Sequence, residues 1–198
     1  MRRGLGHVLA RVRAGAGLGR RGLLHHLLGG RRGARGPGPS PVDAVVVPVG
    51  VGALASAAVR HYRRPGVVVL GVEPRAAACV LESLRAGEIR QVPGPHDSIM
   101  AGLNCGLPSR IAWPALREGL DAVVAIEDDA ARRAMCSLAS VGVVTGAAGA
   151  AALAGLTELA GSGDASRLGL GPDRNVLVLA TEGASDPEAY RRIVGEGA

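Results

Sequence analysis

The feature that most constrains this chain is a regular alternation of short apolar runs with helix-forming segments beyond residue 41. Val, Leu and Ala dominate these runs, as in strands of a parallel sheet that is covered on both faces. We predict strands at residues 44–49, 67–72, 121–126 and 175–180, and helices at residues 53–62, 75–86, 128–139, 146–159 and 187–194. The alternation predicts an α/β fold, with a mainly parallel sheet and helices on both faces.

The beginning of the chain has a different composition. Residues 1–40 contain nine of the 23 arginines and no acidic residue, so residues 41–198 carry 14 arginines (23 − 9) against 17 acids, a net charge of about −3. We expect a disordered basic leader over residues 1–41 and the α/β domain over 42–198. A misassigned start, or an arm that binds nucleic acid or membranes, is also compatible with the leader. The domain itself is not expected to bind nucleic acid, because its net charge is mildly negative.

The cysteines and two long uncharged stretches indicate in which cellular compartment the chain is expected. Cys79, Cys105 and Cys136 are widely separated and form no CxxC pair, which favours reduced thiols in the cytoplasm over a disulfide framework or a zinc site. Residues 44–59 are interrupted by Pro48 and two glycines, and residues 137–157 consist mainly of small residues. We therefore expect buried elements rather than membrane spans.

The strongest chemical motif follows the first predicted strand. Gly50, Val51, Gly52, Ala53 and Leu54 lead from that strand into a helix, and such a turn presents successive backbone N–H groups to an anion such as phosphate. By spacing alone, Gly50 and Gly52 also fit a dinucleotide fingerprint, with Glu73 as the ribose-binding acid. A tight turn without a ligand is the third interpretation. No metal site is expected.

Two stretches extend the motif: VVVPVGVGALASA at residues 45–57 and Gly-Val-Glu-Pro at residues 71–74. They resemble the phosphate loop and the end of the second strand, respectively, of the tryptophan-synthase-like, fold-type-II enzymes that use pyridoxal 5'-phosphate (PLP). One branch, diaminopropionate ammonia-lyase, is similar in more detail. The segments that carry this similarity are residues 78–83, 86–87, 98–106, 111–113 and 181–187, together with Tyr190.

The resemblance implies PLP as the cofactor, a phosphate cradle at residues 50–54, and conversion of a small amino acid, 2,3-diaminopropionate, to pyruvate and ammonia. It also implies that the lysine and the main catalytic carboxylates belong to an N-terminal half upstream of this loop. The chain contains no lysine, and arginine cannot form the Schiff base that holds PLP. Ala147 and Ala148 replace the Glu and Ser of the family's Gly-Glu-Ser-Gly-Ala motif. We therefore predict no catalytic residue in this chain.

Two kinds of function remain open at this point. The first is a truncated ammonia-lyase homologue that is inactive alone and binds PLP without a covalent bond. The second is a non-catalytic phosphate or nucleotide (NAD-type) binding module, or a subunit that needs a partner. An exposed apolar face predicts association with a second copy or with a complementary N-terminal half. Weaker candidates are His96 with Asp97, expected in a surface turn, and Asp128 with Asp129, expected at the start of a helix.

Overall fold

The computed structural model describes residues 41–195, so the predicted leader, apart from Pro41, lies outside the described residues. Four strands form one parallel sheet in the order β3-β2-β1-β4. In register, Val46 of β1 lies between Leu70 of β2 and Val178 of β4. The strands are β1 (Ala44–Pro48), β2 (Val68–Pro74), β3 (Ala122–Ile126) and β4 (Val176–Val178). The predicted α/β fold with a parallel sheet is confirmed.

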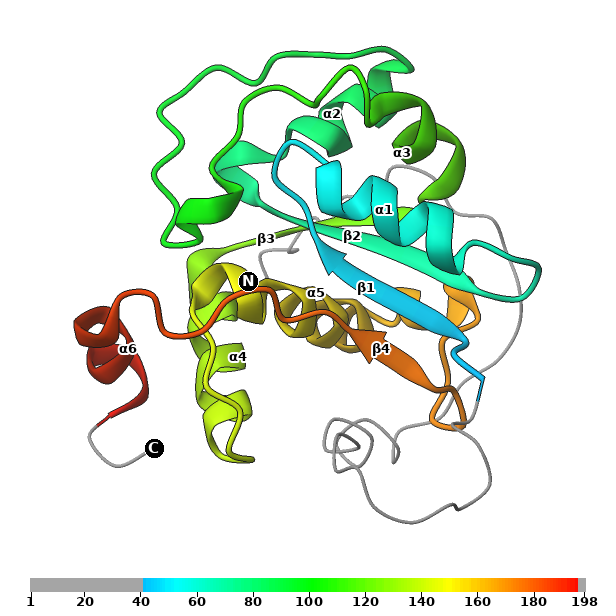
Figure 1. Cartoon of the computed structure of the whole chain (residues 1–198). Coiled ribbons are helices and arrows are strands. Elements are labelled where there is room, and N and C mark those ends of the chain that lie inside the picture. Colours follow the sequence, from blue (N-terminus) through cyan, green and yellow to red (C-terminus); the bar gives the residue numbers. More distant parts are fainter. Residues whose placement is uncertain (1–40, 196–198) are drawn as a thin grey trace, which may run out of the picture.

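Helices cover both faces of this sheet, as predicted (Figure 1). One face carries α1 (Ala53–Tyr62), α2 (Cys79–Ala86) and α3 (Trp113–Gly119). The other face carries α5 (Ala147–Ser162), and α4 (Asp128–Ala139) packs against α5. The last helix, α6 (Pro187–Val194), contacts α4. Short 3₁₀ turns complete the described chain: η1 (Arg75–Ala77), η2 (Ala101–Leu103) and η3 (Asp164–Leu168).

The structure departs from the prediction at two helices, and three other elements have different bounds: β2 ends at Pro74, β4 spans only Val176–Val178, and α5 ends at Ser162. The helix expected over residues 75–86 is split into η1 and α2, because the buried Glu73 carboxylate accepts hydrogen bonds from the amides of Val80 and Leu81 and so sets a new helix start. Helix α3 was not predicted. Its sequence signal was Pro114, since proline is favoured in the first turn of a helix.

The core lies on both sides of the sheet and is built mainly from Val, Leu and Ala. Small residues are required where α5 crosses β2. A Cβ atom on Gly155 would lie 2.4 Å from a methyl group of Val72, which is closer than packed carbon atoms approach. The Ala- and Gly-rich composition of α5 therefore lets helix and sheet backbones lie close together.

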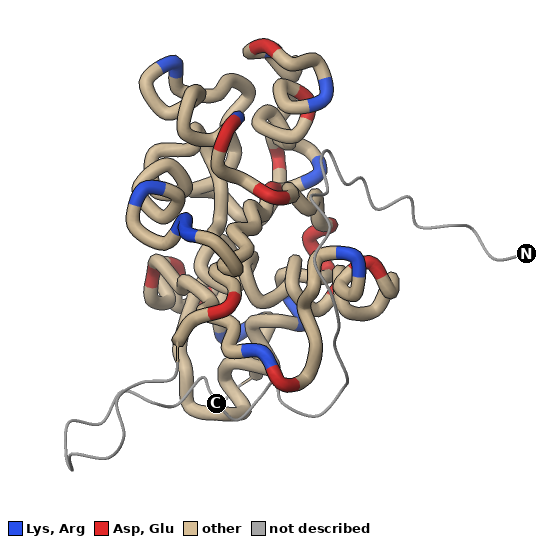
Figure 2. The backbone as a smooth tube through the Cα atoms, turned by 90° about the vertical axis from the view of Figure 1, so that its right-hand side faces the viewer, with Lys and Arg blue, Asp and Glu red and all other residues tan. Residues whose placement is uncertain are grey.

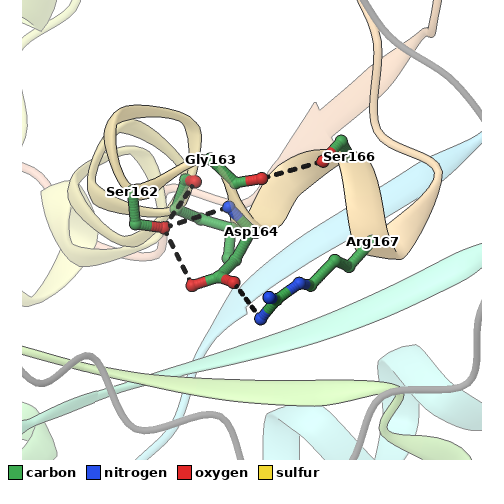
Figure 3. Close-up of polar contacts among 6 residues, drawn as sticks. Ser162, Gly163, Asp164, Ser166 and Arg167 are labelled. Carbon is green, nitrogen blue, oxygen red and sulfur yellow. Dashed lines mark hydrogen bonds and ion pairs between the residues drawn. The ribbon is translucent and has the colours of Figure 1, made fainter.

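The end of α5 is defined by a small polar cluster (Figure 3). Gly163 adopts a left-handed conformation, φ 83°, which is common after a helix C-terminus. The Asp164 carboxylate accepts a hydrogen bond from the Ser162 hydroxyl and forms an ion pair with Arg167 at 2.8 Å. The Ser166 hydroxyl donates to the Gly163 carbonyl, so the turn into η3 uses local partners.

Charged residues are spread over the described surface. Acidic and basic positions are interspersed along the backbone tube in Figure 2. The ion pairs among them are mostly exposed, for example Arg132 with Asp129, and such pairs contribute little to stability. In the part of the chain that the structure describes, no helix combines the length and the apolarity needed to cross a bilayer.

Candidate functional site at the carboxyl end of β1

The site is located by the strand order. The chain runs from β1 outward to β2 and β3, and then returns to the other side of β1 to form β4. In open α/β sheets, ligands bind beyond the carboxyl ends of the strands at such a reversal point. The five residues predicted from the motif, Gly50 to Leu54, directly follow β1 and lead into α1. The topology therefore brings this loop to the place where the fold class binds ligands.

The turn before α1 depends on a glycine. Gly52 precedes α1 with φ 93°, a left-handed conformation that side chains other than glycine rarely adopt. A Cβ atom at this position would lie 2.4 Å from Leu116 Cδ1 of α3. Among the described residues, no group accepts a hydrogen bond from the backbone amides of residues 50–54. These amides are thus available for a ligand.

The electrostatics of α1 favour a negative ligand. No side chain caps the N-terminus of α1, and its first turn contains no acidic residue. The partial positive charge at that helix end is therefore not neutralised by α1 itself. Val51 and Leu54 are 43% exposed and Ala53 is also exposed, whereas Gly52 between them is buried. Free amides and an uncompensated helix end together form a site that suits a phosphate.

Two segments that are distant in sequence support the loop. The amide of Ser109 donates to the Val51 carbonyl at 2.8 Å. A Cβ atom on Gly50 would lie 3.1 Å from the Gly102 carbonyl and 3.2 Å from Cys105 Sγ, so η2 and the residues after it pack directly against the loop. The family-like segment at residues 98–106 is thereby placed beside the predicted cradle. Sequence reasoning did not connect Ser109 and Leu116 with this loop.

The N-terminus of α5 also faces this region. A Cβ atom on Gly102 would lie 3.7 Å from the Ala148 side chain, so Ala148 contacts the same η2 turn. Glu182, which follows β4, accepts hydrogen bonds through Oε1 from the amides of Ala148 at 2.9 Å and Gly149 at 3.2 Å. The Thr145 hydroxyl donates to the Glu182 carbonyl. A carboxylate therefore already occupies the end of α5, in contrast to α1.

Small residues make room for this carboxylate. A Cβ atom on Gly146 would lie 2.5 Å from Glu182 Oε1, and one on Gly149 would lie 3.2 Å from Glu182 Cγ. The close contacts of Gly146 and Gly149 explain why both positions of the altered motif are glycine. Ala148 makes a polar contact only through its backbone amide. The hydrogen bonds from α5 to Glu182 were not predicted, because α5 begins 35 residues earlier in the sequence.

The structure contradicts the role of Glu73 as a ribose ligand. Glu73 is fully buried, and its two oxygens each accept an amide hydrogen bond of 2.8 Å, from Val80 and Leu81. Burial raises the pKa of Glu73 to about 8, and the two amides partly oppose this shift. Burial also raises the pKa of the neighbouring Cys79 thiol, as do Glu73 and Cys105. A carboxyl group that caps α2 inside the core is not available to a nucleotide.

The weaker candidates have structural partners. Asp128 accepts hydrogen bonds from the Ser98 hydroxyl at 2.6 Å and the Ile99 amide at 3.1 Å, so it anchors the loop before η2. Asp128 and Asp129 lie in the first turn of α4, as predicted, and the N-cap residue, Glu127, makes no side-chain cap bond. His96 lies in a loop, as predicted, with Nδ1 3.1 Å from the Ala76 carbonyl. Within residues 41–195, no three His, Cys, Asp or Glu side chains are grouped as metal ligands.

Comparison with known proteins decides the family. The model of the family "pyridoxal-phosphate dependent enzyme" matches residues 35–182, well over half of the chain. The chain belongs to this family. Diaminopropionate ammonia-lyase from Escherichia coli K12 is 31% identical over 166 residues, which cover 77% of this chain and 42% of that enzyme. The biosynthetic L-threonine dehydratase from Mycobacterium tuberculosis is 30% identical over 158 residues, with 34% of its length covered.

Solved structures agree with these matches. A crystal structure of the E. coli diaminopropionate ammonia-lyase, in complex with an aminoacrylate-PLP azomethine reaction intermediate, has a TM-score of 0.71 at 31% identity, covering 81% of this chain and 43% of that chain. Threonine deaminase from Solanum lycopersicum, at 21% identity and a TM-score of 0.69, shares the fold. The chain thus spans about two fifths of the length of the ammonia-lyases that it matches.

Proposed function

We propose that this chain provides the cofactor-phosphate cradle of a PLP-dependent ammonia-lyase that resembles diaminopropionate ammonia-lyase. The observation that carries the proposal is the contrast between the two helix ends at the carboxyl edge of the sheet. Glu182 occupies the end of α5, whereas the amides of residues 50–54 before α1 have no acceptor among the described residues. The family assignment supports PLP as the source of the phosphate.

The residues present fit one part of the cofactor and not its covalent attachment. The amides of Gly50, Val51, Gly52, Ala53 and Leu54 would hold the phosphate group, with the end of α1 adding a favourable charge interaction. When bound, PLP supplies an electron sink for negative charge that develops on an amino-acid substrate. This chain has no lysine to hold the cofactor covalently. On its own, it binds PLP non-covalently and does not turn over 2,3-diaminopropionate.

The test measures binding and covalent attachment separately. Calorimetry with PLP, with pyridoxal that lacks the phosphate, and with NAD should give the tightest binding for PLP. Borohydride reduction of the PLP-loaded chain, with its N-terminal amine blocked, should leave no adduct on an internal side chain. An adduct on an internal side chain would contradict non-covalent binding of PLP. Equal affinities for PLP and pyridoxal would contradict the proposal that the loop binds the phosphate group.

A matched pair of glycine variants locates the binding in the loop. Gly52 and Gly66 both have positive φ, 93° and 84°, but only Gly52 lies in the loop, and a Cβ atom at Gly66 has no neighbour within 4 Å. Gly52→Ala should weaken PLP binding at least tenfold, whereas Gly66→Ala should leave it unchanged. Equal losses in both variants would show that the effect is on overall stability rather than on the cradle.

The finer assignments belong to the same proposal. The natural substrate is a small amino acid, and the chain acts in a reducing cytoplasm, which its three free cysteines permit. Thiol titration of unfolded protein that was purified without reductant should give three free thiols, and a lower value would argue against that compartment. The NAD-type module is not favoured, because Glu73 is committed to α2.

A further inference from the structure

Two helix N-termini lie close together at the carboxyl edge of the sheet. Helix α1 lies on one face of the sheet and α5 on the other (Figure 1), and both begin beside Gly102 of η2. A Cβ atom on Gly50 would lie 3.1 Å from the Gly102 carbonyl oxygen, and a Cβ atom on Gly102 would lie 3.7 Å from the Ala148 Cβ atom. The two helix ends are therefore neighbours, with the η2 turn between them.

The two ends are alike in sequence and in local structure. Each helix has glycine as its N-cap residue, Gly52 for α1 and Gly146 for α5, and glycine supplies no side-chain cap. Neither helix has an acidic residue in its first turn. The first amides of a helix have no partner within the helix, and they give its N-terminus a partial positive charge. Without further groups, both ends would suit an anion.

Glu182 makes the difference between these two ends. Its Oε1 atom accepts hydrogen bonds from the amides of Ala148 at 2.9 Å and Gly149 at 3.2 Å. In contrast, the amides of residues 50–54 have no acceptor among the described residues. The Thr145 hydroxyl donates to the Glu182 carbonyl at 2.8 Å, so the backbone of Glu182 is also tied to the turn before α5. One helix end is thus filled by a carboxylate of the protein, and the other is open.

The position of Glu182 in the fold explains how it reaches α5. Glu182 follows β4, and the Leu179 amide after that strand donates to the Val46 carbonyl of β1 at 3.0 Å. The Gly146 amide donates to the Gly183 carbonyl at 2.9 Å, which fixes the next residue to the start of α5. The connection after β4 is therefore held between β1, which leads into the loop, and α5.

Resting on the proposed function, we propose that Glu182 is a positioning residue that decides at which helix end the phosphate group of the ligand binds. Its carboxylate occupies the amides of Ala148 and Gly149, which a phosphate at the end of α5 would need. The amides of residues 50–54 are then the place where the phosphate binds. Without Glu182, a phosphate would divide between two similar helix ends, and the rest of the ligand would extend from them in two directions.

Amide hydrogen exchange of the full chain, with inorganic phosphate and with PLP as probes, tests this proposal. In the wild-type chain, each probe should slow the exchange of residues 50–54 at least tenfold and change that of Ala148 and Gly149 less than twofold. In Glu182→Ala, the amides of Ala148 and Gly149 lose their acceptor and should exchange at least tenfold faster without a probe. Either probe should then slow these two amides at least fivefold.

Two variants separate positioning from a general loss of structure. Glu182→Gln keeps a side-chain oxygen as acceptor for the two amides. Asp186→Ala removes the carboxylate that caps α6, four residues later in the same connection. In both variants, the probes should change the exchange of Ala148 and Gly149 less than twofold, as in the wild type. Protection of these amides in Asp186→Ala as strong as in Glu182→Ala would attribute the effect to a loosened connection and would overturn the proposal.

The outcomes also distinguish this proposal from the proposed function. If the probes protect residues 50–54 in the wild type but leave Ala148 and Gly149 of Glu182→Ala unchanged, the positioning role alone is wrong. If neither probe protects residues 50–54 in the wild type, the cradle is wrong, and the positioning role is refuted with it. The wild-type measurement is decisive even if Glu182→Ala does not fold, because equal protection of both helix ends by phosphate would overturn the proposal.

Discussion

Replacing the buried Glu73 should change how the stability of this protein depends on pH. Its carboxyl group is fully buried, and its pKa is raised from 4.5 to about 8, mainly by burial. The folded chain therefore binds this proton more tightly than the unfolded chain does. The resulting stability is complete below about pH 4.5 and is lost as the pH rises toward about 8.

The magnitude follows from the pKa. Each pH unit between the two pKa values corresponds to about 1.4 kcal/mol, so the contribution of Glu73 should fall by about 3 kcal/mol between pH 5.5 and pH 8.5. In Glu73→Gln this dependence is absent, and the amide resembles the protonated carboxyl group, because each directs one acceptor oxygen and one donor group at the N–H groups of Val80 and Leu81. The stability of the wild-type chain relative to Glu73→Gln should therefore fall by about 3 kcal/mol between pH 5.5 and pH 8.5.

Urea unfolding of the two proteins at several pH values measures this difference. Taking the difference between the two proteins cancels the titration of every group that does not interact with Glu73. Glu82→Gln is the control, because Glu82 lies on the helix that Glu73 caps, is partly exposed and pairs with Arg85 at the surface. Its effect should stay within about 0.5 kcal/mol at both pH values. Parallel stability curves for wild type and Glu73→Gln would refute the reasoning.

Two further changes test the packing and a helix cap. Gly119→Ala places a Cβ atom 2.1 Å from Val59 Cγ1, between α3 and α1, and should destabilise the fold by about 1–3 kcal/mol in urea unfolding. Gly161 lies near the end of α5, where an added Cβ atom has no neighbour within 4 Å. Gly161→Ala should therefore be neutral or stabilise the fold by up to about 1 kcal/mol. Equal effects of the two would contradict the packing argument. Asp186 caps α6, because its side-chain oxygen accepts hydrogen bonds from the amides of Glu188 and Ala189. In Asp186→Ala, amide exchange in α6 should accelerate about fivefold, which corresponds to about 1 kcal/mol. Asp173→Ala is the control, because Asp173 lies outside any helix, and it should leave this exchange unchanged.

Most of the fold was predictable because the relevant signals are local. The apolar runs that became β1, β2 and β3 are nearly uninterrupted, and the helices α1, α4 and α6 were predicted with the bounds that the structure has. The split between η1 and α2 was not predictable from periodicity. It depends on Glu73, which lies outside the helix and acts through the amides of Val80 and Leu81.

The candidate site was only partly predictable. The glycine-rich loop identified itself by composition, because a positive φ at Gly52 and close approach of the backbone both require glycine. The spacing of Glu73 suggested a ribose ligand, and that interpretation was wrong because spacing carries no information about burial. The support of the loop by Ser109 and Leu116 depends on contacts between segments more than 50 residues apart, which no local pattern records.

The sequence by itself determined the alternation of strands and helices, the family, and the absence of a lysine from this chain. These properties depend on residue type and on short-range periodicity, which are independent of how the elements pack. Only the tertiary structure decided which helix end is free. Glu182 reaches α5 across 33 residues of chain, whereas α1 has no such partner among the described residues. The same packing leaves β4 at an edge, because a strand's neighbours are chosen by the whole sheet and not by its own residues.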